Sequence, residues 1–340
     1  MTDVAAHRAD KVIQWGMRRR DTLPLLIALW STVDARSQQA GKVYRIAWLS
    51  NSPYATTLLW PEFVRGMRER GLMEGQNFTV EHLTSEGHSE RFAALAAEAV
   101  QRKVDVIVCA GTPAAMAARN ATTTIPILFF YVGDPIASGF VASLARPGGN
   151  VTGLGGLSPA IYVKQLELLK EVVPKASRIA MLFNPTLPHH AAVRADAESA
   201  ARSLRVTLRR FELRSPEEID VVLAAVARDK TDALLILGQP FLFPQRDRLA
   251  RFGIDQRLPA IIAFEEVADA GVLMSYGSRI VDDMRRLPHY VDRIFKGAKP
   301  ADLPVEQATR FYLTINLRTA KAIGLVVPMA LLQRADKVIE

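Results

Sequence analysis

Short apolar runs rich in β-branched residues alternate with longer stretches of helical periodicity from residue 43 to the end of this chain. This alternation is typical of βαβ units, in which parallel strands form a sheet and the connecting helices cover its faces. The glycine-rich passage 146–156, RPGGNVTGLGG, separates two such stretches of similar length. The sequence therefore predicts an α/β fold with two lobes, each built on a parallel sheet, that face each other across a cleft.

The first half is expected to contain four strands and four helices. The helical periods are clear where Phe63, Val64 and Met67 share one face, as expected for a helix with one buried side. The expected strands are residues 43–49, 77–83, 104–109 and 127–131, and the expected helices are residues 58–70, 90–101, 113–120 and 136–145.

The second half repeats this pattern and ends with a turn-rich connector at residues 297–304, followed by a last strand and helix. The expected strands are residues 178–183, 206–211, 233–237, 260–263, 272–275 and 310–316. The expected helices are residues 161–172, 189–204, 216–229, 280–295 and 317–323.

Residues 17–39 have the three parts of a cleavable export signal. Three arginines at 18–20 precede the apolar run 23–30, and the sequence Ala35-Arg36-Ser37 places small residues at a processing site. A membrane anchor needs about 20 apolar residues, which this run does not provide. We therefore expect residues 1–37 to be a signal peptide, with Met17 as the translation start because 16 residues of mixed, largely polar character precede it. The start of a buried helix is the alternative interpretation.

The number of cysteines further restricts the cellular location of the protein and the covalent bonds that it can form. Cys109 is the single cysteine, so an intrachain disulfide is excluded and no cysteine stands at the cleavage point, as a lipoprotein requires. We expect export by the Sec or the twin-arginine route to the periplasm, without a lipid anchor. Cys109 ends an apolar run and is interpreted as a small buried hydrophobe.

The charge of the chain is moderately positive. Lys and Arg number 43 and Asp and Glu 35, which gives a formal net charge of +8. Binding to nucleic acid requires a concentrated basic stripe or a recognisable module, and the sequence has neither. No nucleic-acid partner is expected.

Polar residues follow three of the strands predicted in the first half. Ser50 and Asn51 follow the first strand, Thr112 the third and Asp134 the fourth. Because open parallel sheets bind ligands beyond the carboxyl ends of their strands, all four are candidate ligand contacts. Thr112 before Pro113 is typical of a helix start whose amides attract a carboxylate, or of an ordinary N-cap. Asp134 fits either a ligand ammonium or a helix cap.

The second half offers matching candidates. Asn184, Gln239 and Glu265 follow predicted strands, and Tyr276 lies near an expected crossing between the lobes. Amide and carboxylate groups orient polar ligands, and Tyr276 or Phe241 can stack on them. Packing between the lobes is the alternative role for either aromatic ring.

Catalytic signatures are missing from the sequence, which contains no nucleophile elbow, zinc-protease motif or phosphate-binding loop. His189 and His190 have no carboxylate partner at a fixed spacing, and a catalytic histidine normally needs one. Glu265 and Glu266 are adjacent, so their side chains diverge. We expect neither enzyme activity nor a metal or cofactor.

Several motifs together resemble the ABC transporter substrate-binding family. The resemblance extends over roughly residues 43–340 and implies a type I periplasmic binding protein, with two Rossmann-like lobes joined by three crossovers that close by hinge motion around a small solute. The motifs are Gly133-Asp134-Pro135, SLARPGGNVTG at 143–153, Asn184-Pro185, MSYG at 274–277 and GAKPADLPVEQ at 297–307.

The resemblance also implies boundaries for the lobes. The first lobe would comprise residues 43–152 and 278–304, and the second lobe residues 157–275 and 306–340. The crossovers would lie near residues 151–157, Tyr276 and residues 305–311.

The same resemblance implies roles for the candidate residues. Thr112 would contact a ligand carboxylate and Asp134 or Glu265 an ammonium, while Ser50, Asn184 and Tyr276 would line the cleft. The expected function is that of a monomeric periplasmic solute-binding component, which delivers an amino-acid-like polar or aromatic solute to ABC permease subunits. A periplasmic sensor subunit or an enzyme with the same two lobes is the alternative.

Overall fold

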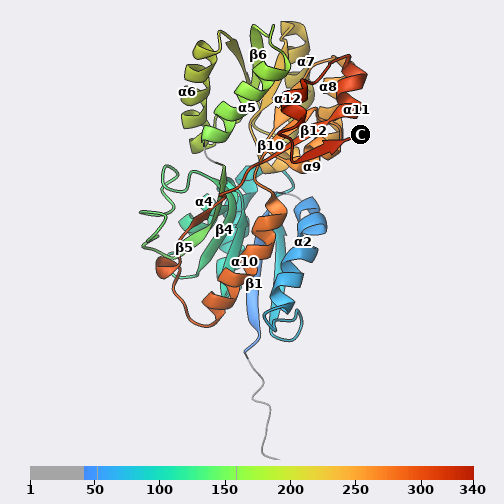
Figure 1. Ribbon diagram of the computed structural model, residues 1–340. Coiled ribbons are helices and arrows are strands. Elements are labelled where there is room, and N and C mark those ends of the chain that lie inside the picture. Colours follow the sequence, from blue (N-terminus) through green and yellow to red (C-terminus); the bar gives the residue numbers. More distant parts are fainter. Residues whose placement is uncertain (1–41, 52, 158) are drawn as a thin grey trace, which may run out of the picture. The chain divides into compact units, whose positions relative to one another are not determined.

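The computed structural model describes residues 42–51, 53–157 and 159–340. The predicted signal peptide, residues 1–37, and the proposed start at Met17 therefore lie outside the described residues. Within the described part, the chain forms a six-stranded and a seven-stranded sheet, both flanked by helices (Figure 1). We call the six-stranded sheet with its helices the first lobe, and the seven-stranded sheet with its helices the second lobe.

The first lobe is built on six parallel strands in the order β11-β5-β4-β3-β1-β2. Helices α2 and α10 pack on each other, and α10 contacts β4 and β5, whereas α3 and α4 form a second pair that contacts β1, β3 and β4. The strands are β1 (Tyr44–Ser50), β2 (Phe78–Thr84), β3 (Val106–Ala110), β4 (Ile127–Gly133), β5 (Val151–Leu157) and β11 (Glu306–Gln307). The helices are α2 (Pro53–Arg68), η1 (Ser89–Arg91), α3 (Phe92–Gln101), α4 (Thr112–Ala121), α10 (Ile280–Phe295) and η4 (Pro300–Asp302).

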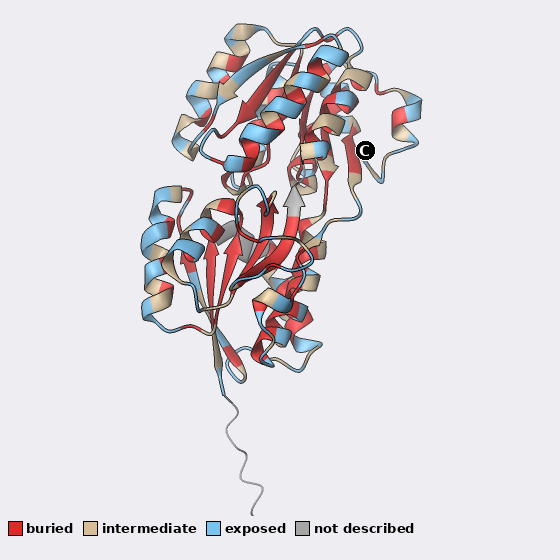
Figure 2. Ribbon diagram, turned by 90° about the vertical axis from the view of Figure 1, so that its left-hand side faces the viewer, coloured by how far each residue is buried: buried red, intermediate tan, exposed pale blue. Residues whose placement is uncertain are grey.

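The core of the first lobe lies on both faces of its central strands. Every residue of β3 and β4 is buried (Figure 2), as expected for parallel strands with helices on each side. Tyr44 and Phe295 stack with ring centroids 3.9 Å apart and join the start of β1 to the end of α10. This packing attaches α10 to a sheet whose other strands lie far away in the sequence.

The second lobe has the strand order β13-β12-β10-β9-β8-β6-β7, and β12 is antiparallel to β10 while the other pairs are parallel. Its strands are β6 (Arg178–Phe183), β7 (Thr207–Glu212), β8 (Ala233–Ile236), β9 (Ala260–Ile262), β10 (Met274–Gly277), β12 (Tyr312–Asn316) and β13 (Lys337–Ile339). Its helices are α5 (Pro159–Val172), α6 (Pro188–Ser203), η2 (Pro216–Glu218), α7 (Ile219–Asp229), η3 (Pro240–Leu242), α8 (Arg246–Asp255), α9 (Glu265–Asp269), α11 (Leu317–Ile323) and α12 (Met329–Leu332).

Residues Val43–Glu340 form one compact unit in which the chain changes lobe repeatedly. It leaves the first lobe after β5, returns to it between β10 and α10, and leaves it again between β11 and β12. This course is that of a type I periplasmic binding protein, the predicted fold class. The residue boundaries given above for the two predicted lobes remain a prediction.

The predicted helix at residues 136–145 is wrong. This segment forms turns instead, because Gly139 has a φ of +70° and the Asp134 carboxylate accepts hydrogen bonds from the amides of Ile136 and Ala137. Phe140 and Val141 are nevertheless buried, which explains the apolar pattern that suggested a helix.

Helix α8 is the longest element that the sequence analysis missed. It contains three arginines and two aspartates but buries only Leu249, Ala250 and Gly253, so its apolar stripe is narrow. Cys109 is fully buried as expected, and burial raises the pKa of its thiol. No helix in the described ranges is long and apolar enough to span a lipid bilayer.

Candidate functional site

The carboxyl ends of the two sheets contact each other. Tyr131 of β4 and Phe264, which follows β9, have ring centroids 4.8 Å apart. A Cβ atom on Gly111 would lie 2.8 Å from Cγ of Pro240, and a Cβ atom on Gly133 would overlap the ring of His189. We call this region the interlobe site; it is formed by the residues at the carboxyl ends of β1, β3, β4, β6, β8 and β9 and at the start of α6 and α10.

Ser50 and Asn51 organise the loops at the end of β1. The carbonyl oxygen of Ser50 accepts a hydrogen bond from the amide of Ser85 at 2.9 Å, and Oδ1 of Asn51 accepts one from Oγ of Ser85 at 2.8 Å. Both predicted residues are buried. These hydrogen bonds join β1 to the loop after β2, and a contact with a ligand remains a prediction.

Thr112 lies inside the first turn of α4, while Gly111 occupies the N-cap position with a φ of +88°. Its Oγ1 is buried and has no hydrogen-bond partner among the described residues. The N-cap interpretation of Thr112 is therefore wrong. A buried hydroxyl group without a partner is costly, so this geometry favours a ligand contact.

Asp134 closes the turn that follows β4. Its Oδ1 accepts hydrogen bonds from the amides of Ile136 at 3.2 Å and Ala137 at 2.9 Å. The charge of Asp134 also raises the pKa of His189, against the larger lowering caused by burial. Asp134 thus caps local structure, and its predicted contact with a ligand ammonium remains untested by these contacts.

The side-chain amides of Asn184 and Gln239 differ in how many of their hydrogen bonds the protein supplies. Oδ1 of Asn184 accepts hydrogen bonds from the amide of Thr186 at 3.0 Å and from its hydroxyl group at 2.8 Å. Nε2 of Gln239 donates to the carbonyl oxygen of Leu213 at 3.3 Å. Oε1 of Gln239 is buried without a hydrogen-bond partner in the described part of the chain.

Glu265 already has two cationic partners. Its Oε2 lies 2.6 Å from Nε of Arg279 and its Oε1 lies 3.0 Å from Nζ of Lys337. Tyr276 is half-buried, and its carbonyl oxygen accepts a hydrogen bond of 2.7 Å from Nε2 of Gln165. The structure thus places Tyr276 at the passage between the lobes and pairs Glu265 within the second lobe.

Three further residues with unpaired buried atoms are absent from the set predicted from the sequence. Tyr131 OH, Gln165 Oε1 and Asp283 Oδ2 are buried, and none has a hydrogen-bond partner within the described ranges. Tyr131 precedes the Gly133-Asp134-Pro135 motif, and Asp283 lies in the first turn of α10, just after the chain leaves β10. For Tyr131 and Asp283, the sequence signal that could have identified them was their position beside a strand end or a crossing between the lobes.

An irregularity in β4 determines the direction of Tyr131. The register between β4 and β5 shifts on both sides of Val132, and Tyr131 has a φ of +58°, which is uncommon for a bulky residue. Phe130 and Tyr131 consequently belong to the same core cluster, although neighbouring strand residues normally point to opposite faces. A bulge of this kind redirects a side chain, here toward the second lobe.

The pKa of the Tyr131 hydroxyl is raised by burial and by acidic groups of both lobes. Burial is the main cause that raises its pKa, and the charges of Tyr162, Glu266 and Asp283 raise it further. A Cβ atom on Gly238 would lie 2.9 Å from this hydroxyl, so a glycine is needed there. Tyr131 therefore lies where α10 of the first lobe approaches β8 and α9 of the second.

Asp283 is only 3 % exposed. Burial raises the pKa of its carboxyl group from 3.8 to about 7, Arg286 opposes this rise and Asp282 adds to it. The guanidinium group of Arg286 forms an ion pair with Glu306. Asp283 is thus a buried acid, and Arg286, the basic group whose charge acts on it, is bound to another carboxylate.

His189 and His190 form a buried pair with ring centroids 4.5 Å apart. Burial lowers the pKa of His189 to about 4, and burial together with His189 lowers that of His190 well below its usual value. Nδ1 of His190 accepts a hydrogen bond of 3.0 Å from the amide of Asn184. Both rings are therefore neutral at pH 7 and contribute polar atoms without charge.

A hollow of about 440 Å³ lies beside these residues and is lined from both lobes. Gly87, Pro113 and Met116 of the first lobe face Leu187 and Arg214 of the second lobe across it. It gives solvent-side space next to Thr112, whose helix contributes Pro113 and Met116.

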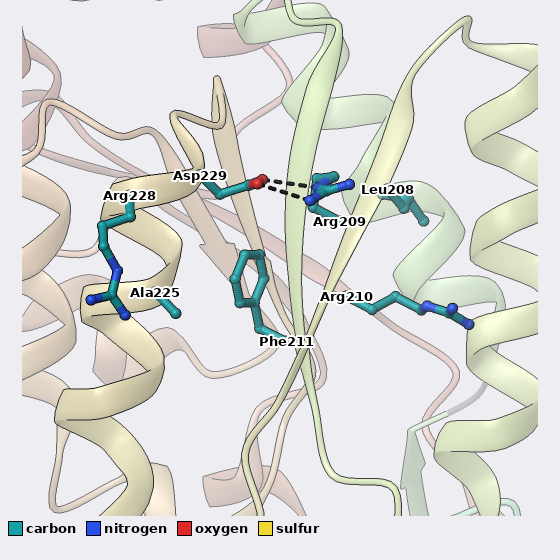
Figure 3. A pocket seen from close by; sticks show the side chains of 7 residues that line it. All are labelled: Leu208, Arg209, Arg210, Phe211, Ala225, Arg228 and Asp229. Carbon is teal, nitrogen blue, oxygen red and sulfur yellow. Dashed lines mark hydrogen bonds and ion pairs between the residues drawn. The ribbon is translucent and has the colours of Figure 1, made fainter.

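A second hollow, of about 490 Å³, lies on the outer edge of the second lobe (Figure 3). Asp229 is held there by Arg209, with an Nη2 to Oδ1 distance of 2.9 Å, and by Arg178 at the start of β6. It lies toward the amino ends of the strands, away from the interlobe site, and two of its charged side chains, Arg209 and Asp229, pair with each other. Its lining residues are Leu208, Arg209, Arg210, Phe211, Ala225, Arg228 and Asp229.

Comparison with known proteins identifies the class to which this fold and site belong. The family described as ABC transporter substrate binding protein matches residues 60–339. The chain therefore belongs to this family, as its motifs predicted, and is a substrate-binding protein of ABC transport.

Individual relatives agree with this assignment. A tyrosine-binding protein of Clostridioides difficile is 25% identical over 265 residues, which cover 77% of this chain and 75% of the relative. A conserved domain protein of Vibrio cholerae is 26% identical with a TM-score of 0.81, covering 87% of this chain and 100% of that structure. A Streptococcus pneumoniae protein solved in complex with L-Trp has the same fold, with 24% identity, a TM-score of 0.80 and coverage of 88% and 100%.

Proposed function

We propose that this chain is the periplasmic solute receptor of an ABC importer, which encloses an amino-acid-like, aromatic or polar solute in the interlobe site and delivers it to permease subunits without changing it chemically. The predicted residues Ser50, Asn51, Thr112, Asp134, Asn184, Gln239, Glu265 and Tyr276 would surround the solute.

The presence of unpaired buried polar atoms in both lobes is the observation that supports this proposal. Thr112 Oγ1 and Asp283 Oδ2 come from the first lobe, and Gln165 Oε1 and Gln239 Oε1 from the second, and none has a partner in the described part of the chain. Buried polar groups are normally hydrogen-bonded, so a polar solute between the lobes would supply the partners. The relative named for tyrosine and the structure solved with L-Trp make an aromatic amino acid the first candidate.

A thermal-shift screen followed by calorimetry tests the solute. A solute at 100 times its dissociation constant should stabilise the protein by about 2.7 kcal/mol, so L-tyrosine, L-tryptophan and other amino acids are added to purified protein. The expected result is a higher melting temperature with one narrow chemical class and recovery of that solute unchanged. No stabilisation by any small solute, or turnover of the solute, would contradict the proposal.

A fractionation experiment tests the location. Expression from Met17 should place the processed protein in the periplasm, and a chain that starts at Gln38 should stay in the cytoplasm. Equal distribution of the two chains would contradict export.

Thr112→Val tests the cleft. It removes a buried hydroxyl group that has no partner among the described residues, so the melting temperature should stay within a few degrees while solute affinity falls. The matched change Thr152→Val removes a hydroxyl group that donates to the Leu303 carbonyl oxygen at 2.6 Å, and it should lower stability by about 1–3 kcal/mol. Unchanged affinity in Thr112→Val would remove Thr112 from the cleft.

A further inference from the structure

The unpaired carboxylate of Asp283 requires a partner of a particular chemistry. The residue is only 3 % exposed, and its Oδ2 accepts no hydrogen bond from any described residue. A buried carboxylate is normally paired with a cation or with several hydrogen-bond donors. A bound group that brings both positive charge and N–H donors would satisfy it.

The basic side chains near Asp283 are engaged elsewhere. Arg286, one turn along α10, forms an ion pair with Glu306. Arg279, at the N-cap of α10, donates through Nε to Oε2 of Glu265 at 2.6 Å. The one basic side chain whose charge acts on Asp283, Arg286, and the arginine that begins the same helix, Arg279, thus both have anionic partners already.

The Tyr131 hydroxyl is a second buried polar group, close enough to Asp283 to feel its charge. It is buried without a partner among the described residues, and the bulge in β4 points it toward the second lobe. The charges of Asp283 from the first lobe and Glu266 from the second both act on it. Two carboxyl groups and a phenol hydroxyl in this region would interact more favourably with a cation than with an anion.

We propose that Asp283 accepts the ammonium group of the bound solute, with the Tyr131 hydroxyl as a further hydrogen-bonding group, so that the solute class is one with a primary ammonium group. This assignment rests on the proposed solute-receptor function and specifies it. Glu265 and Asp134, the carboxylates suggested by sequence position, have protein partners instead. The ammonium would replace the missing partner of Asp283 when the lobes enclose the solute.

Calorimetry with matched solute pairs tests the assignment. The full chain is titrated with L-tyrosine and its deaminated analogue 3-(4-hydroxyphenyl)propanoate, and with L-tryptophan and indole-3-propanoate. The wild type should bind an amino acid and discriminate strongly against its deaminated partner. Asp283→Asn should weaken binding of the amino acid by about 10- to 100-fold, the worth of a hydrogen bond to a charged group, and leave the deaminated acid unaffected.

Two further variants keep the result interpretable. Asp282→Asn changes the neighbouring carboxyl group, whose side chain is 42% exposed, and should alter affinity by less than about 2-fold. Tyr131→Phe keeps the ring that packs on Phe264 and should weaken amino-acid binding by about 2- to 10-fold. Circular dichroism checks folding, and if Asp283→Asn fails to fold, loss of amine discrimination in Tyr131→Phe decides the question.

The contrary outcomes are distinct. Wild-type affinity for the amino acid in Asp283→Asn, or an equal loss for both members of a pair, overturns the role of Asp283. Binding of the deaminated acids in preference to the amino acids overturns the ammonium assignment and leaves the receptor function standing. Binding of no solute at all overturns both.

Discussion

Asp283 illustrates how a single residue of this protein lowers stability at a place suited to binding. Its carboxyl group is buried on the first turn of α10, and desolvation disfavours its charged form. Natural proteins often retain such costs at functional sites, because the group becomes favourable only when a ligand is bound.

The raised pKa of Asp283 predicts a pH dependence of the unbound protein. The pKa of its carboxyl group is 3.8 ordinarily and about 7 when folded, so the unfolded chain loses this proton first as pH rises. The free energy of unfolding should therefore fall between about pH 4 and pH 7, by up to about 4 kcal/mol from this group. Denaturant melts of Asp283→Asn should show a flatter dependence over this range, and an unchanged slope would contradict the burial argument.

Among the residues with unpaired buried atoms, the sequence pointed only to those whose local position marks them. Thr112 and Gln239 follow strands directly, and each has a buried atom without a partner among the described residues. Tyr131 depends on a bulge, and Asp283 depends on packing between segments that are far apart in the chain. Neither a bulge nor long-range packing has a clear signature in residue order.

At the scale of elements, the close pairing of β4 and β5 depends on glycine. Gly153 has a φ of +152°, and a Cβ atom there would overlap the carbonyl oxygen of Phe129 on the neighbouring strand. The glycine-rich passage that looked like a boundary therefore contains a strand whose small residues fit tightly against β4.

This pairing predicts contrasting effects of two substitutions. Gly153→Ala should lower the free energy of unfolding by about 1–3 kcal/mol, because strain and overlap both oppose the added methyl group. Gly149→Ala, where an added Cβ meets no atom within 4 Å, should change it by less than about 0.5 kcal/mol. Denaturant unfolding measures both, and similar values for the two would contradict the tight pairing.

Elements with strong periodicity were predicted well and weakly apolar ones were not. Helices α10 and α11 match the predicted ranges 280–295 and 317–323. Helix α8 was missed because charged residues dominate its sequence, and the antiparallel pairing of β12 with β10 has no signal in either strand alone. The spacing of apolar residues indicates which face of an element is buried. The direction in which two strands pair depends on the path of the whole chain.

At the scale of the whole molecule, the absence of a side chain at Gly133 allows the second lobe to approach. His189, at the start of α6, occupies the space that a Cβ atom on Gly133 would require. The repeated βα pattern predicted two lobes with a cleft between them. It could not predict the contact between Gly133 and His189, because these residues belong to separate lobes and lie far apart in the sequence.

Gly133→Ala should therefore hinder closure of the lobes. Small-angle scattering with saturating solute should give a larger radius of gyration than the wild type, and affinity should fall. The control Gly155→Ala adds a methyl group with ordinary contacts and should behave as the wild type. The double variant Gly133→Ala with His189→Ala should recover affinity, and failure to recover it would show that the overlap is not the cause.

The discontinuous course of the chain also affects how the molecule is made. Helix α10 and strand β11 reach the first lobe only after β6–β10 have been synthesised, and the second lobe still awaits β12 and β13. A nascent chain that ends at β10 has an incomplete core in each lobe, with apolar surface exposed. Domains usually fold in order from the amino terminus during synthesis, whereas here both lobes can be completed only near the end of translation.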